Sequence, residues 1–194
     1  MPPRFIVLEG PDGAGTTLHA KLLAERLTSD GHDVVLTAEP TDGPIGSSVR
    51  TRLKSDETID PLELQTLFSE DRAWHVQNVI QPALDVGKIV ISDRYIASTL
   101  IYGEALGVPL ETLQNMNNNF IQPGLEFVLL PPYEVCRERV MRRESMDKLE
   151  GDALQRKVYE GYERYVEKNP HVKKIDTSGE KDECATKILS HVRT

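Results

Sequence analysis

Short apolar runs rich in β-branched residues alternate along the chain with longer segments whose apolar residues recur every three or four positions. Short runs bounded by turn residues are typical of buried strands, and the longer spacing is typical of amphipathic helices. The pattern predicts strands at residues 4–8, 34–36, 88–91, 127–130 and 171–175. It predicts helices at residues 18–27, 45–53, 61–84, 96–106, 110–120, 133–143, 153–168 and 182–192.

Strands and helices taken in turn are typical of an α/β fold, in which a parallel sheet is covered by helices on both faces. We therefore expect a five-stranded parallel sheet. The 194 residues suit one domain, 1–194, and neither an internal repeat nor a low-complexity linker divides them. In the long segment 61–84, Asp60 before Pro61 is typical of a helix start, and Pro82 predicts a bend.

The first predicted strand runs directly into a glycine-rich loop that ends where the first helix begins. Glycines allow main-chain N–H groups to converge on an anion, and the helix dipole adds partial positive charge there. The spacing Gly10-x4-Gly15-x-Thr17 matches the phosphate-binding loop of P-loop NTPases, with Thr17 placed to ligate Mg²⁺. The predicted ATP-binding residues are Gly10, Pro11, Asp12, Gly13, Ala14, Gly15, Thr16 and Thr17.

The loop departs from this motif at one position, because Thr16 stands where a lysine is expected. That lysine normally reaches the β- and γ-phosphates as a point charge. A glycine-rich turn without it could be a tight connection between strand and helix and nothing more. The glycine spacing, Thr17 and the flanking strand and helix favour phosphate binding instead.

Composition narrows the classes of function. A net charge of −8 argues against a general nucleic-acid binder, whose surface would be basic. No apolar run approaches the roughly 20 residues that span a bilayer, and the first strand follows the N-terminal Met1 almost at once, so we expect a cytoplasmic protein. Cys136 and Cys184 form no metal-ligand motif, and we expect both on helices with at least one of them partly buried.

The third predicted strand continues into Ser92, Asp93, Arg94 and Tyr95. Open α/β sheets bind ligands at the carboxyl ends of their strands, so these polar residues are candidates for a site. Arg94 offers a fork of donors to phosphate, and the carboxylate of Asp93 suits a cation. The alternative is a simple ion pair between the two.

Four separated stretches resemble one family. They are residues 5–17; Glu39-Pro40 with 44–46 and Arg50; residues 67–73; and 93–95 with Ser98, Thr99 and Tyr102. Together they resemble the thymidylate kinases, nucleoside monophosphate kinases that transfer a phosphoryl group from ATP to dTMP. The resemblance runs in register over nearly the whole chain, including the helix that carries Tyr159, Tyr162 and Tyr165.

The resemblance implies a dTMP site. Phe68 would stack on the base, Arg72 would hydrogen-bond it, and Asp12 would accept from the 3′-hydroxyl of the deoxyribose. Tyr102 would pack under the sugar and disfavour a 2′-hydroxyl. The full implied set is Asp12, Glu39, Pro40, Arg50, Phe68, Arg72, Arg94, Thr99 and Tyr102. The alternatives are core packing for Phe68 and a solvated helix arginine for Arg72.

The resemblance also implies Mg²⁺ held by Thr17 and Asp93, partly through water, and Arg94 between the two nucleotides. A charged lid at about 142–152 would supply basic residues to the phosphates, with Arg142 and Arg143 the catalytic candidates. Lys148 and Arg139 are further candidates, although Arg139 suits a solvated helix surface equally well. A homodimer is implied through the helix at 67–84.

Two other functions remain open at the level of sequence. One is a kinase for another pyrimidine deoxynucleoside monophosphate, because base-contacting residues tolerate change. The other is a nucleotide-binding protein whose catalysis is weakened because Thr16 replaces the lysine.

Overall fold

A computed structural model describes residues 3–55, 58–142 and 149–192. Its strands form one sheet in the order β2-β3-β1-β4-β5, and all neighbouring strands are parallel. The strands are β1 (Phe5–Glu9), β2 (Val34–Ala38), β3 (Ile89–Asp93), β4 (Leu125–Leu129) and β5 (Lys173–Ile175). The prediction of a five-stranded parallel sheet is therefore confirmed.

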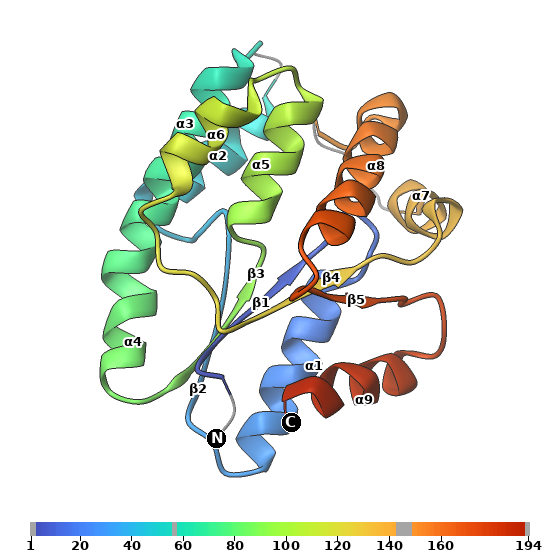
Figure 1. Ribbon diagram of the computed structural model, residues 1–194. Coiled ribbons are helices and arrows are strands. Elements are labelled where there is room, and N and C mark those ends of the chain that lie inside the picture. Colours follow the sequence, from blue (N-terminus) through green and yellow to red (C-terminus); the bar gives the residue numbers. More distant parts are fainter. Residues whose placement is uncertain (1–2, 56–57, 143–148, 193–194) are drawn as a thin grey trace.

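Helices cover both faces of this sheet (Figure 1). The helices are α1 (Thr16–Ser29), α2 (Pro44–Lys54), α3 (Pro61–His75), the π-helix η1 (Val76–Ile80), α4 (Gln81–Asp85), α5 (Ile96–Ala105), α6 (Leu110–Asn117), α7 (Tyr133–Met141), α8 (Asp152–Lys168) and α9 (Lys181–Val192). Helices α1 and α9 pack on one face through a core that includes Ile6, Leu8 and Ile188. On the other face, α4 packs against Val7 and Val90, and α5 and α8 pack against Val128.

The long helix predicted at 61–84 is divided in the structure. It begins as expected, because the Asp60 carboxylate accepts hydrogen bonds from the N–H groups of Leu62 and Glu63 at 2.9 and 3.0 Å. Pro82 has no N–H to continue the regular ladder, and the helix widens into η1 just before it. The bend predicted at Pro82 stays a prediction; what the structure adds is a π-helical turn just before Pro82, which the periodicity did not predict.

Other boundaries moved by a few residues. Strand β5 starts at Lys173, not at His171, because the N–H of Val172 is bonded to Asn169 O in a turn. Helix α6 ends at Asn117, three residues before the predicted end. Cys136 and Cys184 are buried on α7 and α9, as expected.

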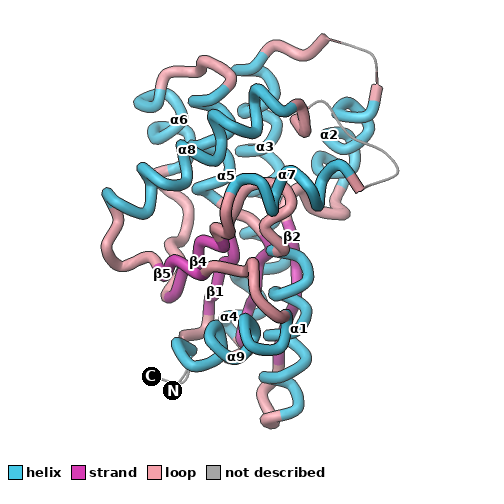
Figure 2. The backbone as a smooth tube through the Cα atoms, turned by 90° about the vertical axis from the view of Figure 1, so that its right-hand side faces the viewer, coloured by secondary structure: helices cyan, strands magenta, loops and turns pink. Residues whose placement is uncertain are grey.

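The strand order determines where a site can form. Because β1 and β3 are neighbours, the loop after Glu9 and the side chains of Asp93 and Arg94 leave the sheet at the same edge, with Leu8 paired to Asp93 in register. Helices α2, α3, α7 and α8 lie beyond this edge (Figure 2). Within the described part of the chain, no helix has both the length and the apolar character needed to cross a membrane.

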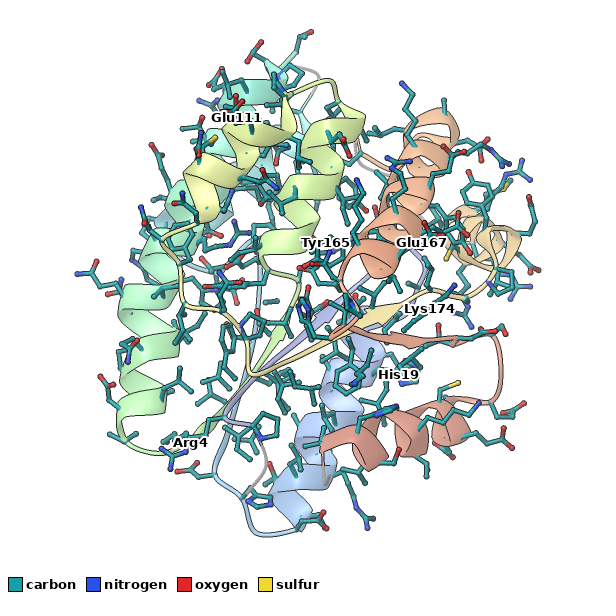
Figure 3. All side chains as sticks on the ribbon, in the orientation of Figure 1. Arg4, His19, Glu111, Tyr165, Glu167 and Lys174 are labelled. Carbon is teal, nitrogen blue, oxygen red and sulfur yellow. The ribbon has the colours of Figure 1, made fainter. Side chains whose placement is uncertain are left out.

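A buried carboxyl group on β4 makes the stability of this fold depend on pH. Glu126 accepts hydrogen bonds from the Tyr165 hydroxyl at 3.1 and 3.2 Å, and Tyr165 lies on α8 beside the sheet (Figure 3). Burial raises the pKa of Glu126 from 4.5 to about 8, with a further contribution from the nearby carboxyl group of Glu9. The folded state therefore holds a proton that the unfolded chain releases above pH 4.5.

We predict that Glu126→Gln removes part of this pH dependence. In the parent, this group contributes stability that is complete below pH 4.5 and is lost as the pH rises through 8, because the folded pKa is the higher one. The difference in melting temperature, variant minus parent, should therefore increase from pH 5 to pH 8.5. A difference that stays constant across this range would contradict the assignment.

Candidate active site

The glycine-rich loop between β1 and α1 adopts a shape that only glycine accommodates at two positions. Gly13 and Gly15 have φ angles of 83° and 89°, in the left-handed region. A Cβ atom on Gly13 would also stand 2.3 Å from the main-chain oxygen of Cys136 on α7. The loop is thus pressed against α7, and no side chain caps the first turn of α1 at Gly15.

Three groups hold the carbonyl oxygens of this loop. Arg94 donates to Gly10 O at 2.9 Å, Arg139 to Gly13 O at 3.2 Å, and the Thr177 hydroxyl to Ala14 O at 2.7 Å. Arg139 also donates to Thr177 O at 2.8 Å. Arg139 is therefore not a solvated surface residue; its guanidinium ties α7 and the segment after β5 to the loop.

The two threonines after Gly15 lie differently. Thr16, where a lysine was expected, is buried at the first position of α1. The hydroxyl of Thr17 donates to Asp93 Oδ2 at 2.5 Å, which joins the first turn of α1 to the end of β3. The other carboxylate oxygen, Oδ1, is buried and has no hydrogen-bond partner among the described residues. An unpartnered anionic oxygen beside a hydroxyl is a donor set that suits a hard divalent cation.

Arg94 occupies the centre of the site. Its backbone has a φ of 71°, a left-handed conformation that is costly for a residue other than glycine. Such strained residues cluster at functional sites. Its guanidinium bonds Asp12 Oδ1 at 2.5 Å and Ser98 Oγ at 3.1 Å. The guanidinium carbon lies 5.3 Å from the centre of the Tyr102 ring. The alternative of a simple ion pair with Asp93 finds no support among the ion pairs of the described residues, where Asp12 is the partner of Arg94.

Asp12 is the acceptor for several groups. Besides Arg94, the Tyr102 hydroxyl donates to its Oδ2 at 2.8 Å, and Gln155 Nε2 donates to the same oxygen at 2.7 Å. Burial raises the pKa of Tyr102, which keeps its hydroxyl protonated as the donor. Gln155 also donates to Leu149 O at 2.6 Å, so this residue on α8 connects the loop to the end of the segment that the structure leaves undescribed.

The buried carboxylate of Glu9, which shares Ser98 Oγ with Arg94, fixes the start of α5. Glu9 accepts from the N–H of Tyr95 at 2.8 Å and from Ser98 Oγ at 2.6 Å. Tyr162 on α8 donates to the same carboxylate at 3.1 Å. Burial raises the pKa of Glu9, and the hydrogen bonds from Ser98 and Tyr95 act in the opposite direction, as does the charge of Arg94. The sequence pattern pointed to neither Glu9 nor Gln155, because their partners come from distant elements.

Arg72 on α3 is 1% exposed, so it is not a solvated helix arginine. Its guanidinium bonds Glu39 Oε2 at 2.6 Å, Thr99 Oγ1 at 3.0 Å and the main-chain oxygen of Tyr95 at 2.8 Å, and it also bonds Asn117. The other oxygen of Glu39 is 2.9 Å from His75 Nδ1. This network joins α3, α5, α6 and the loop after β2.

These elements enclose a cavity of about 120 Å³. It is lined by Asp12, Glu39, Pro40, Leu53, Gln65, Phe68, Arg72, Arg94, Tyr95, Ser98, Thr99, Tyr102 and Leu149. Phe68 also packs against an apolar cluster with Leu64, so it belongs to the core and to the cavity wall at once. Every residue predicted for the monophosphate site except Arg50 lines this cavity.

Arg50 lies in the wall of a neighbouring cavity together with Thr17 and Asp93. Its guanidinium donates to Pro40 O at 2.5 Å and to Asp42 Oδ1 at 2.6 Å. Arg142 is exposed just after α7 and pairs with Glu138 at 2.6 Å. Arg143 and Lys148, and with them most of the predicted lid at 142–152, lie outside the described residues.

Comparison with known proteins gives one consistent family. The family model described as Thymidylate kinase matches residues 8–188. A probable thymidylate kinase of Thermococcus kodakarensis is 39% identical over 201 residues, which cover 98% of this chain and 97% of that protein. Thymidylate kinases of Exiguobacterium sibiricum and Synechococcus sp. (strain JA-3-3Ab) are 32% and 38% identical, over 98% and 97% of this chain and 94% and 95% of theirs.

The Arg72 network predicts a large loss of stability on truncation. Arg72→Met leaves the buried Glu39 carboxylate without its ion pair, and removing one partner of such a pair costs about 3–5 kcal/mol. The matched control is Arg52→Met, because Arg52 pairs with Glu63 on the surface, where the expected loss is about 0–1 kcal/mol. Urea unfolding at pH 7 measures both. Equal losses would contradict the interpretation of the network.

Proposed function

This chain belongs to the thymidylate kinase family, and we propose that it transfers the γ-phosphoryl group of ATP to dTMP, giving dTDP and ADP. One observation carries this proposal: a single guanidinium, that of Arg94, touches both the phosphate-binding loop and the wall of the adjacent cavity. It bonds Gly10 O and the Asp12 carboxylate and lies over the Tyr102 ring. A donor in that position contacts two phosphorylated ligands at once.

In this proposal ATP lies along residues 10–17, where loop N–H groups and the start of α1 face its phosphates. The dTMP base enters the cavity between Phe68 and Thr99, and its sugar lies against Tyr102 and Asp12. Phe68 offers a face for stacking, which is worth about 1–3 kcal/mol per base. Arg50 approaches the monophosphate from the neighbouring cavity, and Glu39 and Pro40 shape the wall.

The reaction requires alignment and charge stabilisation more than covalent chemistry by the protein. A 5′-phosphate oxygen of dTMP forms a bond with the γ-phosphorus of ATP, and the bond from that phosphorus to the β-bridging oxygen breaks, so ADP leaves. Arg94 is held by Asp12 and Ser98 before substrates arrive. A preorganised cation needs no reorganisation when negative charge spreads over the transferring group.

Thr17 and Asp93 are the residues that would hold Mg²⁺, because Asp93 Oδ1 is a buried anionic oxygen with no other partner among the described residues. When bound, Mg²⁺ supplies charge neutralisation of the phosphate oxygens. Arg142 and Arg143, with Lys148, stay the proposed substitutes for the lysine that Thr16 replaces. A single domain, a cytoplasmic location and a homodimer through 67–84 are likewise part of this proposal.

A turnover assay with ATP, Mg²⁺ and dTMP tests the function. We expect dTDP formation, with dTMP preferred over dUMP, dCMP and dGMP in initial rates. A preference for another monophosphate would overturn the substrate assignment. Binding of ATP and dTMP without turnover, rescued by Thr16→Lys, would instead indicate a nucleotide-binding protein that lost catalysis with its lysine.

Arg94→Ala should reduce kcat about 10²- to 10³-fold, because it removes a preorganised charge from the transferring group. Arg26→Ala is the control: Arg26 is an exposed arginine on α1 that pairs with Asp30, and its replacement should leave kcat unchanged. Steady-state kinetics with circular dichroism of each variant makes the comparison. A folded Arg94→Ala protein with near-parental kcat would exclude Arg94 from the reaction.

A further inference from the structure

Gln65 on α3 is a buried amide without a visible structural role. Its side chain is 0% exposed, and neither Nε2 nor Oε1 has a hydrogen-bond partner among the described residues. The residue nevertheless belongs to the wall of the cavity assigned to dTMP. Gln65 is therefore a cavity-wall residue whose buried amide has no partner within the described protein.

The surroundings of Gln65 fix its stem and leave its amide free. Helix α3, which carries Gln65, is in contact with α5 and α6, and these two are in contact with each other (Figure 1). Gly103 on α5 makes room, because a Cβ atom there would stand 3.1 Å from Gln65 Cγ and 2.6 Å from the side chain of Leu113. Along α3, Phe68 and Arg72 follow at three and seven positions, which is the same face of the helix.

An unpartnered buried amide is unfavourable. Leaving a buried donor or acceptor without a hydrogen bond costs about 1–3 kcal/mol, whereas an apolar side chain of the same shape carries no such cost. A methionine or leucine at position 65 would therefore pack against Gly103 and Leu113 without this cost. The cost is recovered only when a ligand supplies the missing partners.

The chemistry of the missing partners can be read from the cavity wall. Two other wall residues have buried unpartnered groups, Arg72 Nε and the Tyr95 hydroxyl. Of these three groups, Gln65 is the one that offers a donor and an acceptor side by side in one plane. An imide such as that of thymine presents the complement, an N–H next to a carbonyl oxygen. Arg72 has only donors, so it cannot accept the imide proton.

We propose that Gln65 is a specificity-determining residue that pairs with the imide edge of the pyrimidine: its Oε1 accepts the N3–H, and its Nε2 donates to a neighbouring carbonyl oxygen. Arg72 Nε then donates to a carbonyl of the same base. The pairing orders the base against Phe68 before phosphoryl transfer. The inference rests on the proposed function, because it names how the same cavity recognises its nucleotide.

Gln65→Met tests the proposal, because methionine keeps the length of the side chain and removes both polar atoms. We expect the Kd for dTMP in titration calorimetry to rise about 5- to 150-fold, which corresponds to the 1–3 kcal/mol of a bidentate contact to a base. The KM for ATP should not change, and the melting temperature should stay equal or rise. The control is Gln114→Met on α6, an exposed glutamine for which no change is expected.

A modified base separates recognition from packing. 3-Methyl-dTMP lacks the N3–H, so the parent should bind it at least tenfold more weakly than dTMP, and Gln65→Met should lose most of that preference. An unchanged preference in the variant, or a lower melting temperature with unchanged dTMP binding, would overturn the proposal and leave a packing role. Gln65→Leu gives the same test if the methionine variant does not fold.

These outcomes differ from a failure of the proposed function. If the parent binds dTMP in calorimetry but forms no dTDP, the kinase assignment fails and the Gln65 comparison still stands, because it is read from binding. If the parent binds dTMP and 3-methyl-dTMP equally well, Gln65 does not read the imide, whatever the turnover.

Discussion

The ion pair between Arg94 and Asp12, at 2.5 Å, is the contact on which the rest of the site depends. It joins the residue after β3 to the loop after β1, and the same guanidinium holds Gly10 O. Tyr102 and Gln155 bring α5 and α8 to the same carboxylate. Four elements therefore meet at one partly buried charge pair, and the left-handed backbone of Arg94 is the conformational cost of placing it there.

A second buried charge system, around Arg72, shapes the cavity. Glu39 is shared between Arg72 and His75, whose other ring nitrogen is 2.7 Å from the Thr37 hydroxyl on β2. Asp71 beside it accepts from the N–H and hydroxyl of Thr41, at 2.7 and 2.6 Å. Buried charges are expensive unless fully paired, and this expense is commonly accepted where a unique geometry is required. Here the geometry is that of the loop after β2, which contributes Glu39 and Pro40 to the wall of the cavity proposed for dTMP.

The sequence predicted the features of the fold and site whose signal lies in neighbouring residues, and it gave little information about features that depend on tertiary contacts. The loop 10–17 and the polar end of β3 were recognisable because glycine spacing and strand ends are properties of neighbouring residues. Arg139 was a candidate for its charge alone and Gln155 was not singled out, because the contacts that tie each of them to the loop 10–17 join positions more than 100 apart. In the sequence, Gln65 is only a polar residue seven positions before Arg72; its burial without a hydrogen-bond partner, which the structure shows, is what makes it a candidate.

The division of 61–84 at Pro82 shows the same limit, since apolar spacing does not distinguish an α-helix from one with a π-helical turn.

The replacement of the lysine by Thr16 changes how the phosphate-binding loop must work. The buried Thr16 offers no charge to a phosphate, so among the described residues binding depends on the shape of the loop and on the start of α1. That shape is held from the carbonyl side by Arg94, Arg139 and Thr177.

The loop is preorganised, because the carbonyl oxygens of Gly10, Gly13 and Ala14 are already bonded. No side chain competes with an anion for the N–H groups in the first turn of α1. Preorganised backbone donors reduce the free-energy cost of ordering the loop around ATP. In the proposed mechanism the absent lysine therefore removes a point charge without removing the anion site, and among the described residues Arg94 supplies the charge that acts on the transferring group.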